Sequence, residues 1–214
     1  MSAAKRGYGG ISSDERRAIR RDALMEAAFD LLTEAGVRGV TKKAVCARAR
    51  LNDRYFYEQF AGPEELLEAV ANDVTADGLR TVVAATLQAH AGIHAQVHAA
   101  AAAALDFVLA DPRRANLLLI SHTDALQRIR LDSVRMIARA MSAMTRELLA
   151  DGGPSPLDTD MAAFTLVSGT MELVAAWIRG EYDTSRDHLA EVVAAMLLSA
   201  AEISTTIPSP DSGQ

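Results

Sequence analysis

Cysteine is almost absent from this sequence, and its scarcity limits what kind of protein the chain can be. Among 214 residues there is one cysteine, Cys46. A single thiol excludes an internal disulfide framework and a metal site built from several cysteines. The composition therefore fits a reducing compartment, in which disulfides are rare.

Long apolar runs are also missing. The alanine-rich tract at residues 99–105 is closed by Asp106, and nowhere is there an apolar run of about 18 residues that would predict a membrane span. The first residues, MSAAKRGYGG, carry charge but lack the apolar segment of a signal peptide. We therefore expect a soluble, cytoplasmic protein without a membrane partner.

Catalytic and cofactor motifs are absent as well. The sequence has no nucleophile elbow, P-loop, GxGxxG turn or HExxH pair, which predicts a protein that is not an enzyme and uses no cofactor. His90, His94 and His98 recur at a spacing that could align imidazoles on a metal. Because Gly92 interrupts this run and no carboxylate falls in step, we favour partly buried or solvated histidines. Metal binding by the run stays open.

Charge is present but unevenly distributed. Residues 1–60 carry 12 basic and 8 acidic side chains, a net charge of +4, whereas the whole chain has −6, so the remainder has −10. This asymmetry favours a basic module that docks on a polyanion and an acidic module with another role. Uneven scatter of charge is the alternative.

Helical periodicity dominates the chain, and no alternating strand pattern follows residue 63. The fold class is therefore predicted to be all-α. Ser12 with Glu15 fits a capping box for a first helix that ends at Gly36. Thr41 and Asn52 can cap a second helix at 42–49 and a third that runs to about residue 59. Further helices are predicted near 63–90, 93–110, 112–121, 125–149, 158–179 and 186–203.

The break after the third helix predicts the domain organisation. Gly62 and Pro63 restart the chain there, and proline suits the first position of a new helix. We expect an N-terminal three-helix domain at residues 12–62, a helical domain at 63–205 and a disordered tail, rich in proline and serine, at 206–214.

Aromatic residues make up 5% of the chain, yet the stretch LNDRYFYEQF at 51–60 holds four of them. Successive side chains on a helix turn by about 100°, so these rings cannot all face one core. Phe56 and Phe60 share one side and are predicted to pack inward, against Leu31, Val45 and Leu66.

Tyr55 and Tyr57 then point to either side of the third helix. Two short helices joined by a three-residue turn match a helix-turn-helix, whose second helix enters the major groove of DNA. In that setting one tyrosine hydroxyl can reach a base edge and the other a phosphate. A plain core is the alternative, but it cannot place all the rings.

The segment TKKAVCARARLNDRYFYEQFAGPEEL, at residues 41–66, resembles the pattern of TetR-family transcriptional regulators, and the resemblance extends over residues 14–70. It implies a helix-turn-helix DNA-binding domain followed by a helical domain for ligand binding and dimerisation. Tyr57 falls where the family places its phosphate-binding tyrosine. Residues 52–55 fall where it places its base-reading residues.

These positions divide the expected DNA contacts. Bases are predicted to be read by Asn52, Asp53, Arg54 and Tyr55, with Arg54 a candidate for guanine and Asp53 able to accept a hydrogen bond from cytosine N4. Phosphates are predicted to be held by Thr41, Lys42, Arg50 and Tyr57.

Three residues depart from the family pattern. Arg50 replaces a glycine usual in the turn, so either the backbone avoids positive φ or arginine costs roughly 1 kcal/mol there. Pro63 stands where a lysine often touches the DNA backbone, so that contact is lost. Cys46 replaces a small alanine and is interpreted as a buried space-filler.

The resulting interpretation is a homodimeric, ligand-responsive repressor that leaves a palindromic double-stranded DNA operator when it binds a small apolar or amphipathic effector. The dimer interface is predicted on the last two helices, at Met171, Val174, Ile178, Leu189, Val193, Met196 and Leu197. Candidate effector contacts are His98, Phe107, Leu118, His122, Met136, Ala140, Met144, Phe164 and Glu172. The alternative is a helical small-molecule carrier or scaffold without specific DNA binding.

Overall fold

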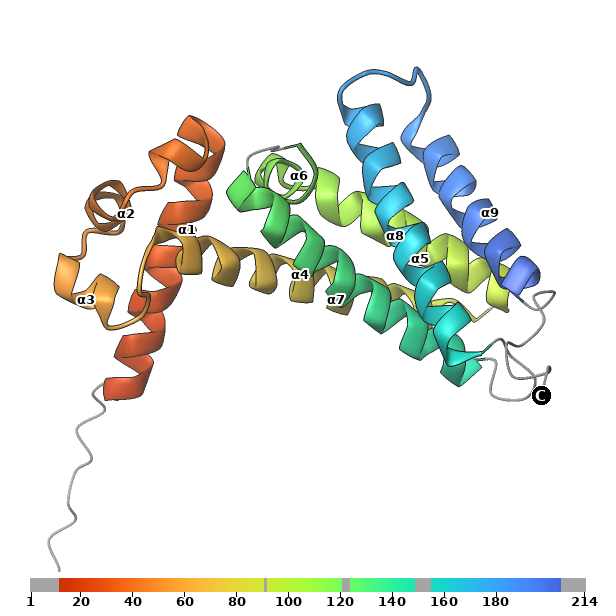
Figure 1. Cartoon of the computed structure of the whole chain (residues 1–214), viewed down its shortest axis with the longest axis horizontal. Coiled ribbons are helices and arrows are strands. Elements are labelled where there is room, and N and C mark those ends of the chain that lie inside the picture. The colour runs from red at the N-terminus through yellow and green to blue at the C-terminus, as the bar shows by residue number, and fades with distance from the viewer. Residues whose placement is uncertain (1–11, 91, 121–123, 149–154, 205–214) are drawn as a thin grey trace, which may run out of the picture. The chain divides into compact units, whose positions relative to one another are not determined.

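The computed structural model describes residues 12–90, 92–120, 124–148 and 155–204, and over these ranges the chain is all-α, without a strand (Figure 1). The predicted tail at 206–214 lies outside them. The elements are α1 (Ser13–Gly39), α2 (Lys42–Ala49), α3 (Asp53–Tyr57), α4 (Pro63–Gln88), α5 (Ile93–Leu109), α6 (Pro112–Ala115), the π-helix η1 (Asn116–Ile120), α7 (Asp124–Leu148), α8 (Pro156–Ile178) and α9 (Arg186–Ser204).

The chain forms two compact units, Met1–Val70 and Ala71–Gln214. The sequence pattern predicts a division at 62/63, where α4 begins, whereas the first turns of α4 belong to the N-terminal unit. Leu66, Leu67 and Val70 on these turns are buried. The apolar positions at the start of α4 therefore complete the core of the smaller unit.

The N-terminal unit is a three-helix arrangement in which α1 packs against α2 and α3. The predicted capping box is confirmed, because Ser12 Oγ accepts from the backbone N–H of Glu15 at 3.0 Å and Glu15 accepts from that of Ser12 at 2.7 Å. Gly36 has φ of 66°, a left-handed conformation that glycine adopts without strain, and it kinks α1 near its end. Leu24, Ala28 and Leu32 on α1 are fully buried.

The C-terminal unit is built from helix pairs, in which α7 packs on α8 and α5 on α9. Helices α8 and α9 form an antiparallel hairpin (Figure 1). One apolar cluster in this unit joins Ala101 of α5 to Val193 and Ala194 of α9, with Val97, Leu173 and Leu197 packed around it. Much of the apolar surface of α9 is thus buried within a single chain.

The predicted helix at 112–121 differs in its hydrogen bonding. It starts as α6, with Asp111 accepting from the N–H of Arg113 at 2.9 Å, and continues as the π-helix η1. A π-turn widens the helix by one residue. Leu117, Leu118 and Leu119 within it are buried, so tertiary packing outweighs the regular α pattern here.

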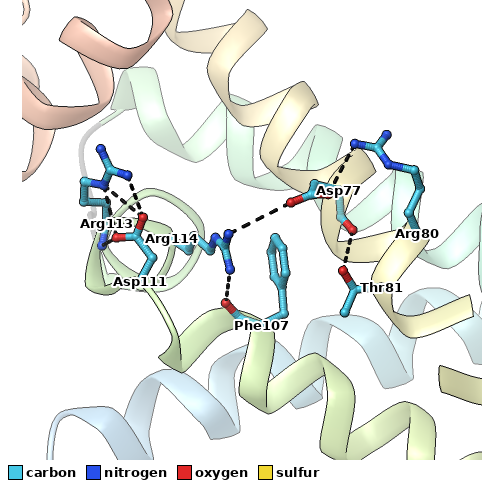
Figure 2. A network of polar contacts seen from close by, with 7 residues as sticks. All are labelled: Asp77, Arg80, Thr81, Phe107, Asp111, Arg113 and Arg114. Carbon is cyan, nitrogen blue, oxygen red and sulfur yellow. Dashed lines mark hydrogen bonds and ion pairs between the residues drawn. The ribbon is translucent and has the colours of Figure 1, made fainter. Parts of the chain in front are cut away.

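A polar network fastens α4 to the corner between α5 and α6. Figure 2 shows Arg114 joined by dashed lines to Asp77 and to the carbonyl of Phe107. The guanidinium carbon of Arg114 lies 3.9 Å from the centroid of the Phe107 ring, and Nη1 donates to the Phe107 carbonyl at 2.7 Å. Arg114 Nη2 lies 4.0 Å from Asp77 Oδ2. A Cβ on Gly78 would come within 3.0 Å of the same ring. Glycine there permits the close approach of α4 to Phe107.

Helix α8 is unusually apolar for its degree of burial. An 18-residue window has a mean hydropathy of 1.5, of which 33% is buried, and by length and composition alone it could span a membrane. The bent pair Ile93–Leu109 and Pro112–Leu119 passes the same test only if counted as one span with a 100° bend. Since α8 packs on α7 and α9, its composition is also that of a helix with one face in a core and another available to a partner.

Candidate nucleic-acid interface

A helix-turn-helix is formed by α2, α3 and the turn between them. A side chain caps the N-terminus of each helix. Thr41 Oγ accepts from the N–H of Ala44 at 3.2 Å, and Asn52 Oδ1 accepts from the N–H of Tyr55 at 3.2 Å. Both caps follow the sequence prediction. The Thr41 hydroxyl hydrogen and the Asn52 amide hydrogens are not used by these caps, so both residues keep a donor for another partner.

The turn is closed by Arg50, whose backbone is left-handed, with φ 54° and ψ 38°. The sequence left open whether the backbone at Arg50 avoids positive φ or arginine accepts the cost of it. The structure shows the second case, a positive φ. The N–H of Leu51 donates to the carbonyl of Cys46 at 2.9 Å, which ends α2 and sets the direction of α3. A residue with a Cβ costs about 1–2 kcal/mol in this conformation. Arg50 is exposed, so the conformation carries its cation to the surface of the turn.

Helix α3 has five residues, and a helix this short is not stable by itself in water. It is held by Phe56, which is fully buried, and by Phe60, which is 2% exposed. The two ring centroids lie 6.0 Å apart. Leu31, Val45 and Leu66 are buried as well, so the predicted inward side of this segment is confirmed.

Ion pairs also secure α3 and α2 against α1. The Glu58 carboxylate, just after α3, binds Arg54 at 3.0 Å and Arg20 at 3.9 Å, and its carbonyl accepts from Arg17 at 3.1 Å. Arg48 of α2 donates twice to Glu34 of α1, at 3.0 and 2.5 Å, and this contact lowers the pKa of Glu34. Several of the basic residues of this unit are thus used for internal packing.

The predicted DNA-contacting residues fall into two groups. Thr41, Arg50, Asn52, Asp53, Arg54 and Tyr57 are exposed. Tyr55 is half-buried, because the Arg20 guanidinium covers its ring at 4.6 Å from the centroid, and Lys42 is also half-buried. Tyr57, in contrast, is 61% exposed. The face that α3 presents to solvent therefore consists of Asn52, Asp53, Arg54 and Tyr57, with the turn at Arg50 beside it.

Lys42 forms a small cluster with two of these residues. Its Nζ lies 2.5 Å from Asp53 Oδ2 and 5.1 Å from the centroid of the Tyr57 ring. The hydrogen bond to Asp53 raises the pKa of Lys42. Burial raises the pKa of the Cys46 thiol, and the negative charge of Asp53 adds to this effect. Cys46 is 4% exposed, as a space-filling residue would be.

The residues guessed as effector contacts are scattered in the C-terminal unit. Phe107 and Leu118 are buried, Met136, Ala140 and Met144 are half-buried, and His98, Phe164 and Glu172 are exposed. His122 lies outside the described residues. The Glu172 carboxylate binds Arg130 at 2.7 Å and Arg179 at 3.3 Å, contacts that lower its pKa, so within this chain it acts as an ion-pair node.

Four of the residues assigned to the dimer interface, Met171, Val174, Leu189 and Val193, are buried within the single chain. Ile178 and Leu197 are half-buried, and Met196 is 45% exposed. Neighbouring apolar residues of α8 that the sequence pattern did not single out for an interface are more exposed. Leu157 is 60%, Met161 54% and Phe164 41% exposed.

The histidine run is surface-exposed at His90, His94 and His98. His90 Nδ1 faces the carbonyl of Gln88 at 2.5 Å. Over the described ranges, no three His, Cys, Asp or Glu residues gather in a way that could hold a metal ion.

The helix-turn-helix lies in a segment that matches a known family. Residues 24–70 match the model of the bacterial regulatory proteins of the tetR family. No curated protein matches the sequence.

Solved structures share the fold over most of the chain. A protein from Mesorhizobium loti assigned to the tetR family has a TM-score of 0.67 at 16% identity, covering 88% of this chain and 98% of its own. The fatty acid degradation regulator FadR from Bacillus halodurans has a TM-score of 0.64 at 16% identity, covering 84% and 94%. A TetR-like transcriptional regulator from Rhodococcus sp. RHA1 has a TM-score of 0.58 at 20% identity, covering 85% and 94%.

Proposed function

We infer that this chain, a TetR-family transcriptional regulator, represses transcription from a palindromic operator as a homodimer in the cytoplasm and is released by a small apolar or amphipathic effector. The exposed face of α3 carries this proposal. Asn52, Asp53, Arg54 and Tyr57 offer hydrogen-bond donors and acceptors of the types that read base edges and hold phosphates. A palindrome follows from two-fold symmetry, because each protomer presents one such helix.

Arg54 is the residue best placed to read a base. Its side chain is 83% exposed, and its partner Glu58 also binds Arg20, so Glu58 stays paired if Arg54 moves into the groove. A guanidinium that binds guanine O6 and N7 together contributes about 1–3 kcal/mol of discrimination. Tyr57, by its exposure and its position at the end of α3, is assigned to a phosphate.

A binding experiment can distinguish the base contact proposed for Arg54 from the phosphate contact proposed for Tyr57. The operator is first selected by the purified protein from a random DNA pool, and affinities are then measured by fluorescence anisotropy. Arg54→Ala should weaken operator binding by about 1–3 kcal/mol and relax the preference at one base pair, while Tyr57→Phe should weaken operator and scrambled duplex alike.

Salt dependence provides the control, because affinity for DNA falls steeply with salt when phosphates are neutralised. Equal losses on both duplexes for both variants would contradict the division of contacts. A wild-type protein that binds no duplex even at low salt would refute the function and leave the carrier or scaffold hypothesis.

The effector site is proposed within the C-terminal unit, around Phe107, Leu118 and the half-buried methionines Met136 and Met144. Apolar walls with few polar groups suit an apolar or amphipathic ligand, and methionine adapts to varied shapes. The structurally similar FadR of Bacillus halodurans is a fatty acid degradation regulator, so fatty acids are suitable first probes.

A thermal-shift screen with monocarboxylic fatty acids should reveal ligands that raise the unfolding temperature and release the operator. Dicarboxylic acids of equal chain length are the matched control, because their second charge disfavours an apolar site. A tenfold loss of operator affinity requires about 1.4 kcal/mol of coupling. Operator release by the dicarboxylic acids alone would contradict the proposed apolar site. A compound that stabilises the protein without releasing the operator would not identify an effector.

A further inference from the structure

The exposed face of α3 carries an acidic side chain whose partner is a cation from α2. Asp53 Oδ2 lies 2.5 Å from Lys42 Nζ, with the Asp53 side chain 60% exposed and that of Lys42 32% exposed. The Lys42 ammonium also lies over the Tyr57 ring. The pair therefore sits on the surface that the proposed function turns toward DNA, between a base-reading and a phosphate-binding position.

A Lys42 ammonium that turns fully toward a phosphate gives up its 2.5 Å contact with Asp53. A lysine that moves to a phosphate leaves Asp53 without its cation, close to the negatively charged DNA backbone. Arg54 presents a different case, because Glu58 retains Arg20 at 3.9 Å if Arg54 leaves. The cost of breaking the ion pair thus falls on Asp53 in particular.

Only a base with an amino group in the major groove, cytosine N4 or adenine N6, can replace the lost cation. In the major groove, cytosine N4 carries an amino donor that a carboxylate accepts from, whereas guanine O6 and N7 and thymine O4 are acceptors that repel a carboxylate. A site that places the amino donor opposite Asp53 compensates the carboxylate and releases Lys42 to a phosphate. At other sites the pair stays closed and Lys42 neutralises no phosphate.

We propose that Asp53 is a specificity gate, which holds Lys42 away from the phosphate backbone until a base amino group, with cytosine N4 as the preferred donor, takes its place. This inference rests on the proposed DNA-binding function. It implies that Asp53 lowers affinity for non-cognate DNA, and that Lys42 contributes to operator binding but hardly to binding of random duplex.

The test compares wild type, Asp53→Asn, Lys42→Met and the double variant on the selected operator and on a scrambled duplex, over a range of salt concentrations. Asp53→Asn should raise the affinity for scrambled duplex about fivefold and steepen its salt slope by about 0.9, the value for one additional phosphate contact. The salt slope on the operator should not change, because Lys42 already reaches a phosphate there.

The double variant and a neighbouring lysine provide the controls. In the Asp53→Asn protein, Lys42→Met should return the salt slope on scrambled duplex to the wild-type value. In the wild-type background, Lys42→Met should hardly change the affinity for scrambled duplex. Lys43→Met removes the same charge from the same helix and should act equally in both backgrounds. Asp53→Glu keeps the carboxylate and should keep the shallow slope. Thermal unfolding of each variant checks that the exposed substitutions leave the fold intact.

The outcomes separate the gate from the function on which it rests. Operator binding by wild type with an unchanged scrambled-duplex affinity and slope in Asp53→Asn would overturn the gate alone. Equal effects of Lys42→Met and Lys43→Met in both backgrounds would do the same. A wild-type protein that binds neither duplex would overturn the DNA-binding function and the gate together.

Discussion

Replacing Phe56 by alanine should unfold the N-terminal unit and abolish DNA binding. Phe56 is the largest fully buried side chain of that unit, with 0% exposure, and removing a buried phenylalanine costs about 3–5 kcal/mol. A domain of this size buries a smaller fraction of its unfolded surface than a larger domain does and is only marginally stable. Helix α3 has five residues, so it has no independent stability to retain when its anchor is lost.

The two units can be followed separately in this experiment. The chain has one tryptophan, Trp177 of the C-terminal unit, whose Nε1 donates to the carbonyl of Thr184 at 2.9 Å. Urea unfolding followed by circular dichroism reports helix in both units, while tryptophan fluorescence reports the C-terminal one. We expect Phe56→Ala to lose helical signal and DNA binding but to keep the fluorescence transition.

Tyr57→Ala is the matched control, because it removes an aromatic ring from the adjacent position, where the side chain is 61% exposed. Exposed substitutions typically change stability by about 0.5 kcal/mol or less, and the edge contact between the Tyr57 and Phe56 rings adds about 0.5–1.5 kcal/mol. The control should lose affinity for DNA and stay folded. A Phe56→Ala protein with wild-type helix content would contradict the assignment of Phe56 as the anchor of α3.

Introducing a charge on the exposed face of α8 should convert the proposed dimer into monomers. Leu157, Met161 and Phe164 are exposed on the first half of α8, and Met196 is 45% exposed on the second half of α9. Because the two helices run antiparallel (Figure 1), these segments lie at the same end of the hairpin. Four apolar side chains in this position favour a second copy of the chain as partner.

Phe164→Asp places an unpaired carboxylate in that interface, and two-fold symmetry places it there twice. Burying an uncompensated charge costs several kcal/mol, so we expect the dimer dissociation constant to rise by at least about a thousandfold, equivalent to about 4 kcal/mol. Light scattering should report the monomer mass, and operator affinity should fall because the two half-sites are no longer bound together.

Two further variants sharpen this test. Leu87→Asp alters a leucine that is 71% exposed on α4 and should leave the dimer unchanged. Val193→Asp alters a side chain that is 4% exposed and packed in the cluster with Ala101 and Ala194, so it should destabilise the monomer fold itself. An unchanged dimer with Phe164→Asp, or a monomeric wild type, would show that the interface is placed on the wrong surface.

The sequence by itself determined most of the helices of this protein, the π-helix η1 excepted, and much of its helix-turn-helix. Ser12 with Glu15, Thr41 and Asn52 are caps whose effect is local, since each satisfies N–H groups within three residues of itself. The spacing of Phe56 and Phe60 determined which side of the third segment is buried, because helical periodicity is a property of the chain alone.

Only the tertiary structure decided which side chains meet and which stay free. Periodicity shows that Lys42 and Asp53 lie on different helices, but the left-handed turn at Arg50 brings them into contact. It is the packing of α3 on α1 that brings Arg20 over Tyr55, and the packing of α9 on α5 that buries Val193, which the sequence pattern had assigned to an interface. An apolar stripe predicts that a helix face is buried. Which helix or second chain buries it depends on contacts between residues far apart in the sequence.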